Sequence, residues 1–212
     1  MKTLIPYMQQ LGRALMLPIA VLPVAGLLLR LGQPDLLNLA FIAGAGDAIF
    51  ANLGILFAIG VAVGLARENN GAAALAAVVG YFVATKGAEV LIQAPVGLID
   101  VSEAHAGLQL AAYKSKEIAK LSVPIGILSG LIAGYLYNRY SNIKLPAYLA
   151  FFAGRRFVPI ASGFVGLLVA FAFGSGWPII EQGMDQLSHL VTESGNVGLF
   201  VYGVLNRILI AT

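Results

Sequence analysis

The chain has 212 residues, of which 59% are hydrophobic and 11% charged, and its net charge is +3. Soluble domains carry about 25% charged residues, so this composition excludes a water-soluble globular fold for much of the chain. The absence of cysteine excludes disulfides, thiolate metal sites and thiol nucleophiles, and the small charge spread over short loops gives no basis for a nucleic-acid partner.

Six apolar segments are candidates to cross a bilayer, which takes about 20 mostly apolar residues. The predicted fold is therefore all-α, a polytopic transmembrane helical protein in one domain. The spans are predicted near residues 11–31, 48–66, 71–92, 121–140, 157–180 and 195–212. We expect Pro18 and Pro23 to kink the first span.

The segment before the second span, Gly44–Asp47, resembles a nucleotide-binding loop only faintly. It lacks the third glycine, the preceding strand and the following Lys-Ser/Thr that such loops need. We interpret it as a capping turn in which Asp47 is the N-cap of the second span.

Polar and charged residues are frequent between the third and fourth spans. Residues 93–120 are therefore predicted to be a solvated loop, and a short helix over Tyr113–Lys120 is an alternative for its end. In the fourth span, Gly126, Gly130 and Gly134 recur every four residues and place glycine on one helix face. Such a face lets another helix approach closely, either within the chain or in a second subunit.

The distribution of Lys and Arg predicts a cytoplasmic N-terminus. In that orientation seven of them are cytoplasmic and five lie on the other side. The cytoplasmic set is Lys2, Arg13, Arg67, Arg139, Lys144, Arg155 and Arg156, and the outer set is Arg30, Lys86, Lys114, Lys116 and Lys120.

The segment Phe151–Ile160 combines aromatic residues, two arginines and a proline at the start of the fifth span. This mixture is typical of a segment in the headgroup region of the membrane. His105 and His189 have no partners at metal-ligand spacing on a supporting helix pattern, so no metal and no other cofactor is expected, and no catalytic residue is assigned in this chain.

Arg207 is the remaining charge, inside the last apolar segment. A charge in a spanning segment is unfavourable by several kcal/mol unless it meets a partner or a water-filled cavity. Its forked guanidinium would suit several oxygen acceptors, such as sugar hydroxyls or a carboxylate. The alternative is that Arg207 lies near a helix end and extends its side chain to the headgroups.

Several stretches together resemble the membrane-embedded IIC component of bacterial sugar phosphotransferase systems, in its glucose, maltose and N-acetylglucosamine branch. Two further stretches, Arg30–Asn38 and Gly71–Phe82, are most similar to the N-acetylglucosamine-specific members. The resemblance covers nearly the whole chain except about residues 93–120. The stretches that carry it are Leu11–Gly26, Leu56–Ala66, Ile143–Pro146, Phe151–Ile160 and Tyr202–Thr212.

This resemblance implies that the chain is the N-terminal half of a ten-span permease in the bacterial inner membrane. Asn206 and Arg207 would bind the substrate, N-acetylglucosamine or glucose, and the arginine would donate hydrogen bonds to it. The phosphoryl-carrying cysteine would belong to a IIB domain, itself served by a IIA domain, and a histidine segment and a glutamate loop would follow Thr212. A homodimer is expected.

Two functions remain open from the sequence. In the first, the chain belongs to a permease that translocates the sugar as the IIB partner phosphorylates it. In the second, it is a truncated membrane scaffold without transport activity, or one half of a split transporter.

Overall fold

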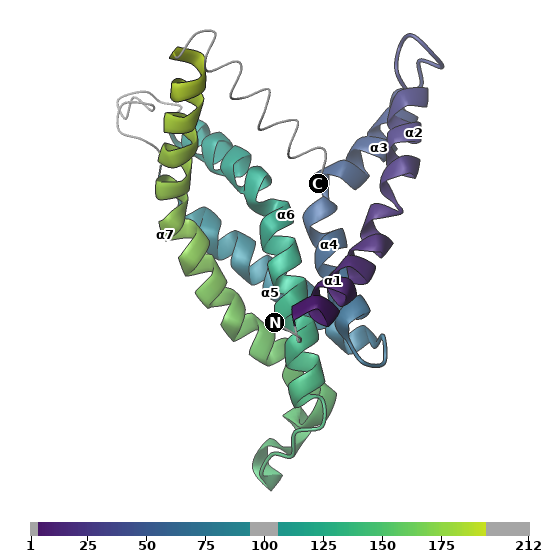
Figure 1. The fold of residues 1–212 in the computed structure, drawn as a ribbon, viewed down its shortest axis with the longest axis vertical. Helices are drawn as coiled ribbons and strands as arrows, with labels where there is room; N and C mark the ends of the chain where they lie inside the picture. Colours follow the sequence, from purple (N-terminus) through teal and green to yellow (C-terminus); the bar gives the residue numbers. More distant parts are fainter. Residues whose placement is uncertain (1–3, 94–105, 194–212) are drawn as a thin grey trace. The chain divides into compact units, whose positions relative to one another are not determined.

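The computed structural model describes residues 4–93 and 106–193, and it divides the chain into two compact units after Gly174. The described residues form helices and loops and contain no strand, so the all-α prediction is confirmed (Figure 1). The elements are α1 (Leu4–Ile19), α2 (Leu22–Leu31), α3 (Ala40–Ala51), α4 (Leu53–Leu65), α5 (Gly71–Leu91), α6 (Ala106–Tyr140), the 3-10 helices η1 (Ala147–Phe152) and η2 (Gly154–Arg156), and α7 (Phe157–Glu193).

The first apolar segment is interrupted, as its two prolines predict. Pro18 lies in the last turn of α1, and Pro23 lies in the first turn of α2. A proline has no N–H to donate and clashes with the preceding turn, so the helix breaks between them. Together the two pieces supply a candidate span over Gln9–Leu31.

The second segment is also a broken pair, in which α3 and α4 are bent by 55°. The helix begins at Ala40, so the interpretation of Asp47 as an N-cap was wrong, because Asp47 lies within α3. The stretch that precedes Asp47 is apolar and has no helix-breaking proline, so the helix already begins at Ala40. The break falls instead at Asn52, whose side-chain amide donates to the carbonyl of Ala48 at 2.8 Å and competes with the backbone ladder.

A correction also applies to the polar segment 93–120. Of its described residues, Gln93 is not helical, and residues 106–120 form the start of the 35-residue helix α6, which continues through Pro124 to Tyr140. The short helix expected over Tyr113–Lys120 is therefore part of a longer one. Alanine, leucine, glutamine, lysine and glutamate are good helix formers, and they dominate this stretch despite its polarity.

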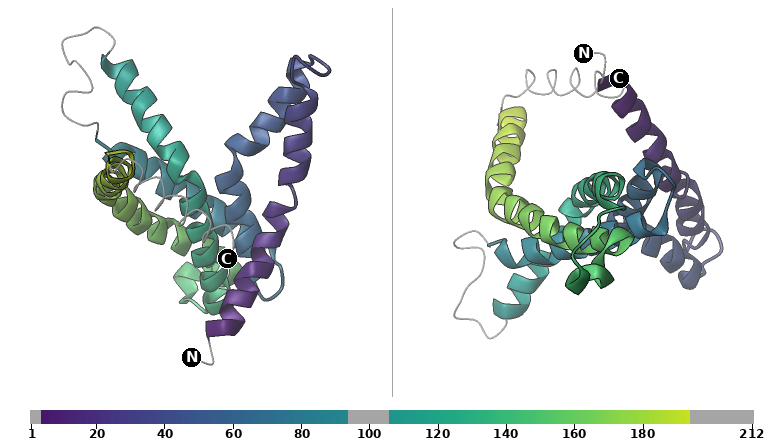
Figure 2. Two further views of the ribbon diagram at one scale, coloured as in Figure 1. Left: turned by 45° about the horizontal axis from the view of Figure 1, so that its top comes forward. Right: turned by 90° about the horizontal axis from the view of Figure 1, so that it is seen from below.

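Within the first unit, α4 packs against α1, α5 and α6, and α6 also packs against α5 (Figures 1 and 2). The core is built mainly from small residues. Its fully buried members include Ala58 and Ala62 of α4, Ala76 and Ala77 of α5, and Ala133 of α6. Small side chains let the helix axes approach closely, which is how helices associate in lipid.

The glycine face of α6 packs against α4 of the same chain. Of the two partners considered for this face, the structure therefore shows a helix within the chain and not one in a second subunit. A methyl group added at Gly126 would overlap the carbonyl oxygen of Gly54, and one at Gly130 would lie 2.7 Å from the carbonyl oxygen of Ala58. At Gly134 the nearest atom would be Cβ of Leu65, at 2.8 Å. The two backbones are therefore in direct contact at Gly126 and Gly130, and the close packing continues to Gly134.

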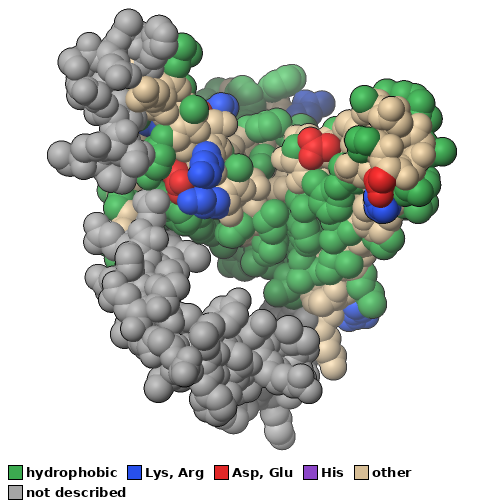
Figure 3. Space-filling model, turned by 90° about the horizontal axis from the view of Figure 1, so that it is seen from above, with side chains coloured by type: hydrophobic (Ala, Val, Ile, Leu, Met, Phe, Trp, Pro, Cys, Tyr) green, Lys and Arg blue, Asp and Glu red, His purple; other side chains and the backbone are tan. Residues whose placement is uncertain are grey.

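Large apolar side chains cover the outside of the molecule, and charged groups are few on the face shown in Figure 3. Four described helices are long and apolar enough to cross a membrane, or up to five if the bent α3–α4 pair counts as one span. The sixth expected span, 195–212, lies outside the described residues.

We predict that Gly126→Ala destabilises the protein, because the new methyl group would force the α4 and α6 backbones apart. Overpacking of this kind is unfavourable by about 1–3 kcal/mol. Thermal unfolding in detergent should show a lower Tm for this variant. Gly107→Ala in the same helix is the matched control, since a methyl group there meets nothing within 4 Å. Equal Tm values for the two variants would contradict the close backbone contact.

Candidate functional site

The two substrate-binding residues expected from the sequence, Asn206 and Arg207, lie outside the described residues, and their role stays a prediction. The structure does describe other polar groups, which the apolar helices hold in defined positions. Some of these groups gather at the helix ends, whereas Thr85, Glu117, Ser129 and Ser162 are buried within helices.

The most connected polar group lies where the loop between α4 and α5 meets the C-terminal end of α6. We call its members, Glu68, Tyr137, Asn138 and Arg155, the end cluster. Arg155 Nη2 lies 2.7 Å from Glu68 Oε2, and the Tyr137 hydroxyl donates to the same oxygen at 3.2 Å. One carboxylate thus joins η2 to α6 through the loop that follows α4.

Asn138 holds the end of α4. Its Nδ2 donates to the carbonyl of Leu65 at 2.9 Å, and its Oδ1 accepts from the backbone N–H of Arg67 at 2.9 Å. A helix leaves its last carbonyl groups without an internal partner, and Asn138 supplies one from a neighbouring helix. The chain then turns through Asn69, whose φ is +46°, and Asn70 caps α5 by accepting from the N–H of Ala72.

The hydrogen bonds of Asn138 contribute more to the stability of the protein than the ion pair between Glu68 and Arg155. The side chains of Glu68 and Arg155 are 61% and 54% exposed, and exposed pairs contribute about 0–1 kcal/mol. Asn138 is half-buried, and its removal would leave two backbone groups without their partner.

A polar pocket of about 330 Å³ lies beside the end cluster. Its lining comes from α1, from the loop after α4 and from α6. Two guanidinium groups and two amides in one pocket suit an anionic or hydroxylated group. The lining residues are Gln10, Arg67, Tyr135, Asn138 and Arg139.

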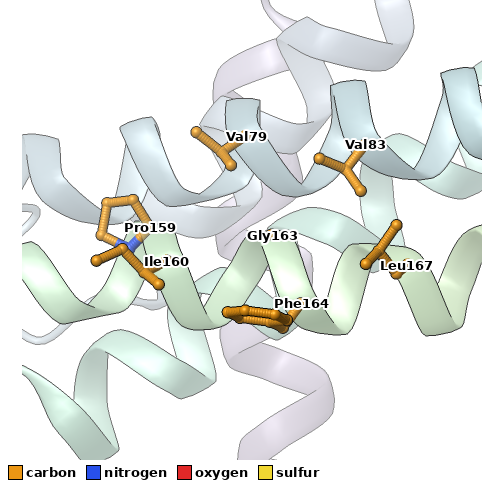
Figure 4. Close-up of a pocket in the computed structure, with 7 residues that line it drawn as sticks. All are labelled: Val79, Val83, Pro159, Ile160, Gly163, Phe164 and Leu167. Atoms are coloured by element: carbon orange, nitrogen blue, oxygen red, sulfur yellow. The ribbon is translucent and has the colours of Figure 1, made fainter.

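A second hollow, which we call the α5–α7 groove, is apolar and has a volume of about 260 Å³ (Figure 4). Two valines of α5 face the first three turns of α7 across it. Such a groove suits a hydrocarbon chain and offers no polar group to a sugar. It is lined by Val79, Val83, Pro159, Ile160, Gly163, Phe164 and Leu167.

The segment that precedes α7 exposes its aromatic residues, as a membrane-interface segment would. Tyr148 is 82% exposed and Phe151 is 70% exposed. The Arg156 guanidinium lies 4.9 Å from the centroid of the Phe151 ring and donates to the Phe151 carbonyl at 3.3 Å. Aromatic rings and arginines at the start of a spanning helix match the composition of the lipid headgroup region.

Charged pairs also occur away from the end cluster. In α6, Glu117 is buried, and both of its carboxylate oxygens accept from Lys120 Nζ, at 2.7 and 2.8 Å. After α2, Arg30 and Asp35 form an exposed ion pair at 2.7 Å, and the hydrogen bond from Arg30 lowers the pKa of the Asp35 carboxyl.

Sequence reasoning missed Tyr137, Asn138 and the buried Glu117. Asn138 carried a signal, since it is a polar residue in the last turn of an apolar span, but its partners are 71 and 73 residues away in sequence. Within residues 4–93 and 106–193, no group of three or more His, Asp or Glu side chains could hold a metal ion. The chemistry of the end cluster is that of a structural clamp.

Comparison with known proteins adds a family match to this geometry. The family model described as "Phosphotransferase system, EIIC" matches residues 12–212. The chain is similar to the PTS system N-acetylglucosamine-specific EIICBA component of Escherichia coli, with 48% identity over 206 residues, which cover 97% of this chain and 28% of that protein.

Two further relatives extend the comparison. A glucosamine-specific EIICBA component of Bacillus subtilis is 44% identical over 203 residues, covering 96% of this chain and 30% of that protein. An N-acetylglucosamine-specific EIIC component of Streptomyces coelicolor is 41% identical over 212 residues, which cover 96% of this chain and 49% of that protein. The chain thus spans less than half the length of each of these relatives.

We predict that Asn138→Ala lowers the stability of the protein by about 1–3 kcal/mol, because it leaves the Leu65 carbonyl and the Arg67 N–H without their partner. Glu68→Gln removes the charge of an exposed ion pair and keeps an amide oxygen that can accept from Tyr137, so it should lower the stability by about 1 kcal/mol or less. Thermal unfolding of both variants in the same detergent measures the difference. A larger loss for Glu68→Gln would show that the ion pair, and not the amide, holds the helix ends together.

Proposed function

Since the chain belongs to the EIIC family of the phosphotransferase system, we propose that it forms the N-terminal part of a membrane permease for an amino sugar. The observation that carries this proposal is the family match over residues 12–212, on a chain whose described helices are long and apolar enough to cross a membrane. The proposed sugar is N-acetylglucosamine, with glucose as the alternative. In its support, two of the relatives above are named for N-acetylglucosamine and one for glucosamine.

In this proposal Arg207 and Asn206 bind the sugar. A guanidinium inside an apolar segment must find oxygen acceptors, and sugar hydroxyls supply several in one plane. The described helices then serve as the scaffold against which the sugar-binding part of the permease is held.

The proposed partners are IIB and IIA domains, in the same chain or in separate ones. The name EIICBA given to two of the relatives supports this part of the proposal. The IIB domain would donate a phosphoryl group to a sugar hydroxyl at the cytoplasmic face. The sugar would then be trapped inside by its new negative charge.

We also propose that the protein lies in the bacterial inner membrane with its N-terminus in the cytoplasm. In support, Arg67 and Arg155 lie at the same helix ends, since the end cluster ties their loops together. Arg139 follows Asn138 at that end of α6 and lines the same pocket as Arg67. Basic residues gathered at one membrane face favour the cytoplasmic side. Assembly as a homodimer is part of the proposal and rests on the family resemblance alone.

The test is uptake of radiolabelled N-acetylglucosamine by cells whose only sugar system of this type is the complete permease. Arg207→Ala should lower uptake by at least about 100-fold, because several hydrogen bonds to a charged donor are lost, each worth about 1.5–3 kcal/mol. Asn206→Ala should lower it by a smaller factor, since a neutral amide makes weaker hydrogen bonds.

Lys144→Ala is the matched control, since it removes a cation from a loop that the proposal does not place at the sugar. Its uptake should match that of the unmodified permease at equal membrane abundance. Unchanged uptake by the Arg207→Ala variant would remove this residue from the sugar site. Uptake of glucose and not of N-acetylglucosamine by the unmodified permease would overturn the choice of sugar.

A further inference from the structure

We propose that the α5–α7 groove and Arg156 together bind one anionic phospholipid. One acyl chain of the lipid lies in the groove, and its phosphate contacts the guanidinium of Arg156. The proposal uses none of the residues of the proposed sugar site and does not depend on which sugar is carried.

The shape of the α5–α7 groove fits an acyl chain within one leaflet of the membrane. Along α7 the groove extends from Pro159 to Leu167, which is about 12 Å at 1.5 Å per residue. One leaflet has about 15 Å of hydrocarbon, half of the bilayer core of about 30 Å. Gly163 lies in the middle of the groove, where an added methyl group would come within 3.4 Å of Cγ1 of Val79 (Figure 4).

The position of Arg156 places a cation at the headgroup end of this groove. Arg156 is the last residue of η2, which continues directly into α7, and it precedes the groove residues Pro159 and Ile160 by three and four residues, close to the spacing of one helix face. Side chains on a helix tilt toward its N-terminus. The groove residues on this face therefore extend toward the start of α7, where Arg156 lies. A lipid phosphate lies at the same level, just outside the hydrocarbon region.

The two arginines at the start of α7 differ in what holds them. Arg155 is engaged by Glu68, whereas none of the salt bridges among the described residues includes Arg156. Phe151 holds the Arg156 guanidinium from one side, through its ring and through one hydrogen bond to its carbonyl. The guanidinium of Arg156 has further N–H groups to donate, and a phosphate can accept two of these hydrogen bonds at once.

A second copy of the chain is the rival occupant, and charge disfavours it. It could fill the apolar part of the groove, but it would also have to place a carboxylate opposite Arg156. The carboxylate that the structure describes at this end of the helices is Glu68, which already pairs with Arg155. An anionic lipid supplies both the apolar chain and the negative charge.

The proposal is tested by native mass spectrometry of the full chain in a mild detergent, titrated with phosphatidylglycerol or with phosphatidylcholine. The unmodified chain should bind phosphatidylglycerol about tenfold more tightly. Arg156→Gln should abolish this preference, and Arg156→Lys should keep part of it. Lys144→Gln, which removes an equal charge from a nearby loop, should leave it unchanged.

A second pair of variants tests the groove. Gly163→Leu should lower the affinity for both lipids several-fold, because the new side chain occupies the groove. Gly44→Leu is its control, since Gly44 lies on α3 with nothing within 4 Å of an added methyl group. Gel filtration confirms that each variant is folded, and the Arg156 variants test the site even if Gly163→Leu does not fold.

Two results would overturn the proposal. One is an equal affinity of the unmodified chain and of Arg156→Gln for phosphatidylglycerol. The other is efficient disulfide formation between copies of a Leu167→Cys variant in the membrane, which would show that a second chain covers the groove. The second result is easily interpreted because the natural sequence has no cysteine.

Discussion

The direct contact between the backbones of α4 and α6 is the interaction on which the rest of the first unit depends. In lipid, burying an apolar side chain gains little, because the acyl chains are as apolar as the protein. Helices are then held by close packing, and here Gly54 and Gly126 remove the side chains that would keep the axes apart. Alanines continue the same contact toward α5, and Gly64 continues it toward Ala14 of α1.

Several polar groups lie where the helices end. Their position follows from the lipid surroundings of the helices, which offer no hydrogen-bond partner. A backbone carbonyl or N–H that lacks a partner is costly near the hydrocarbon, so each loop must satisfy its own groups or borrow a partner. Asn138 is such a partner for the end of α4. Within the helices, the buried Ser162 of α7 donates to the carbonyl of Ala76 in α5 at 2.7 Å. These bonds fix the register of neighbouring helices that packing of small residues alone would leave loose.

The start of α7 combines these two constraints with contact to the membrane. Arg155 pairs with Glu68 and so joins the loop after α4 to η2, while the neighbouring Arg156 contacts Phe151. Two adjacent arginines with the same sequence environment thus have different partners. Only the arrangement of the surrounding helices separates them.

Some predictions failed at polar positions that lie within helices. Aspartate often caps helices, which favours Asp47 as a helix start, and the polarity of residues 93–120 favours a loop. In α3 the helix runs through Asp47 because the surrounding stretch is apolar and has no proline, and α6 begins in a stretch rich in good helix formers. Asn138 could not be assigned, because its partners come from a helix more than 60 residues earlier in the chain.

The sequence by itself determined the class of the protein. Long apolar runs with few charges indicate a helical membrane protein, two prolines predict a kink in the first span, and the glycine spacing predicts a close helix contact. Only the tertiary structure decided which helix meets the glycine face, which arginine pairs with Glu68, and that Asn138 holds the end of α4. The physical reason is that composition and periodicity describe one helix at a time, whereas these contacts depend on which distant segments pack side by side.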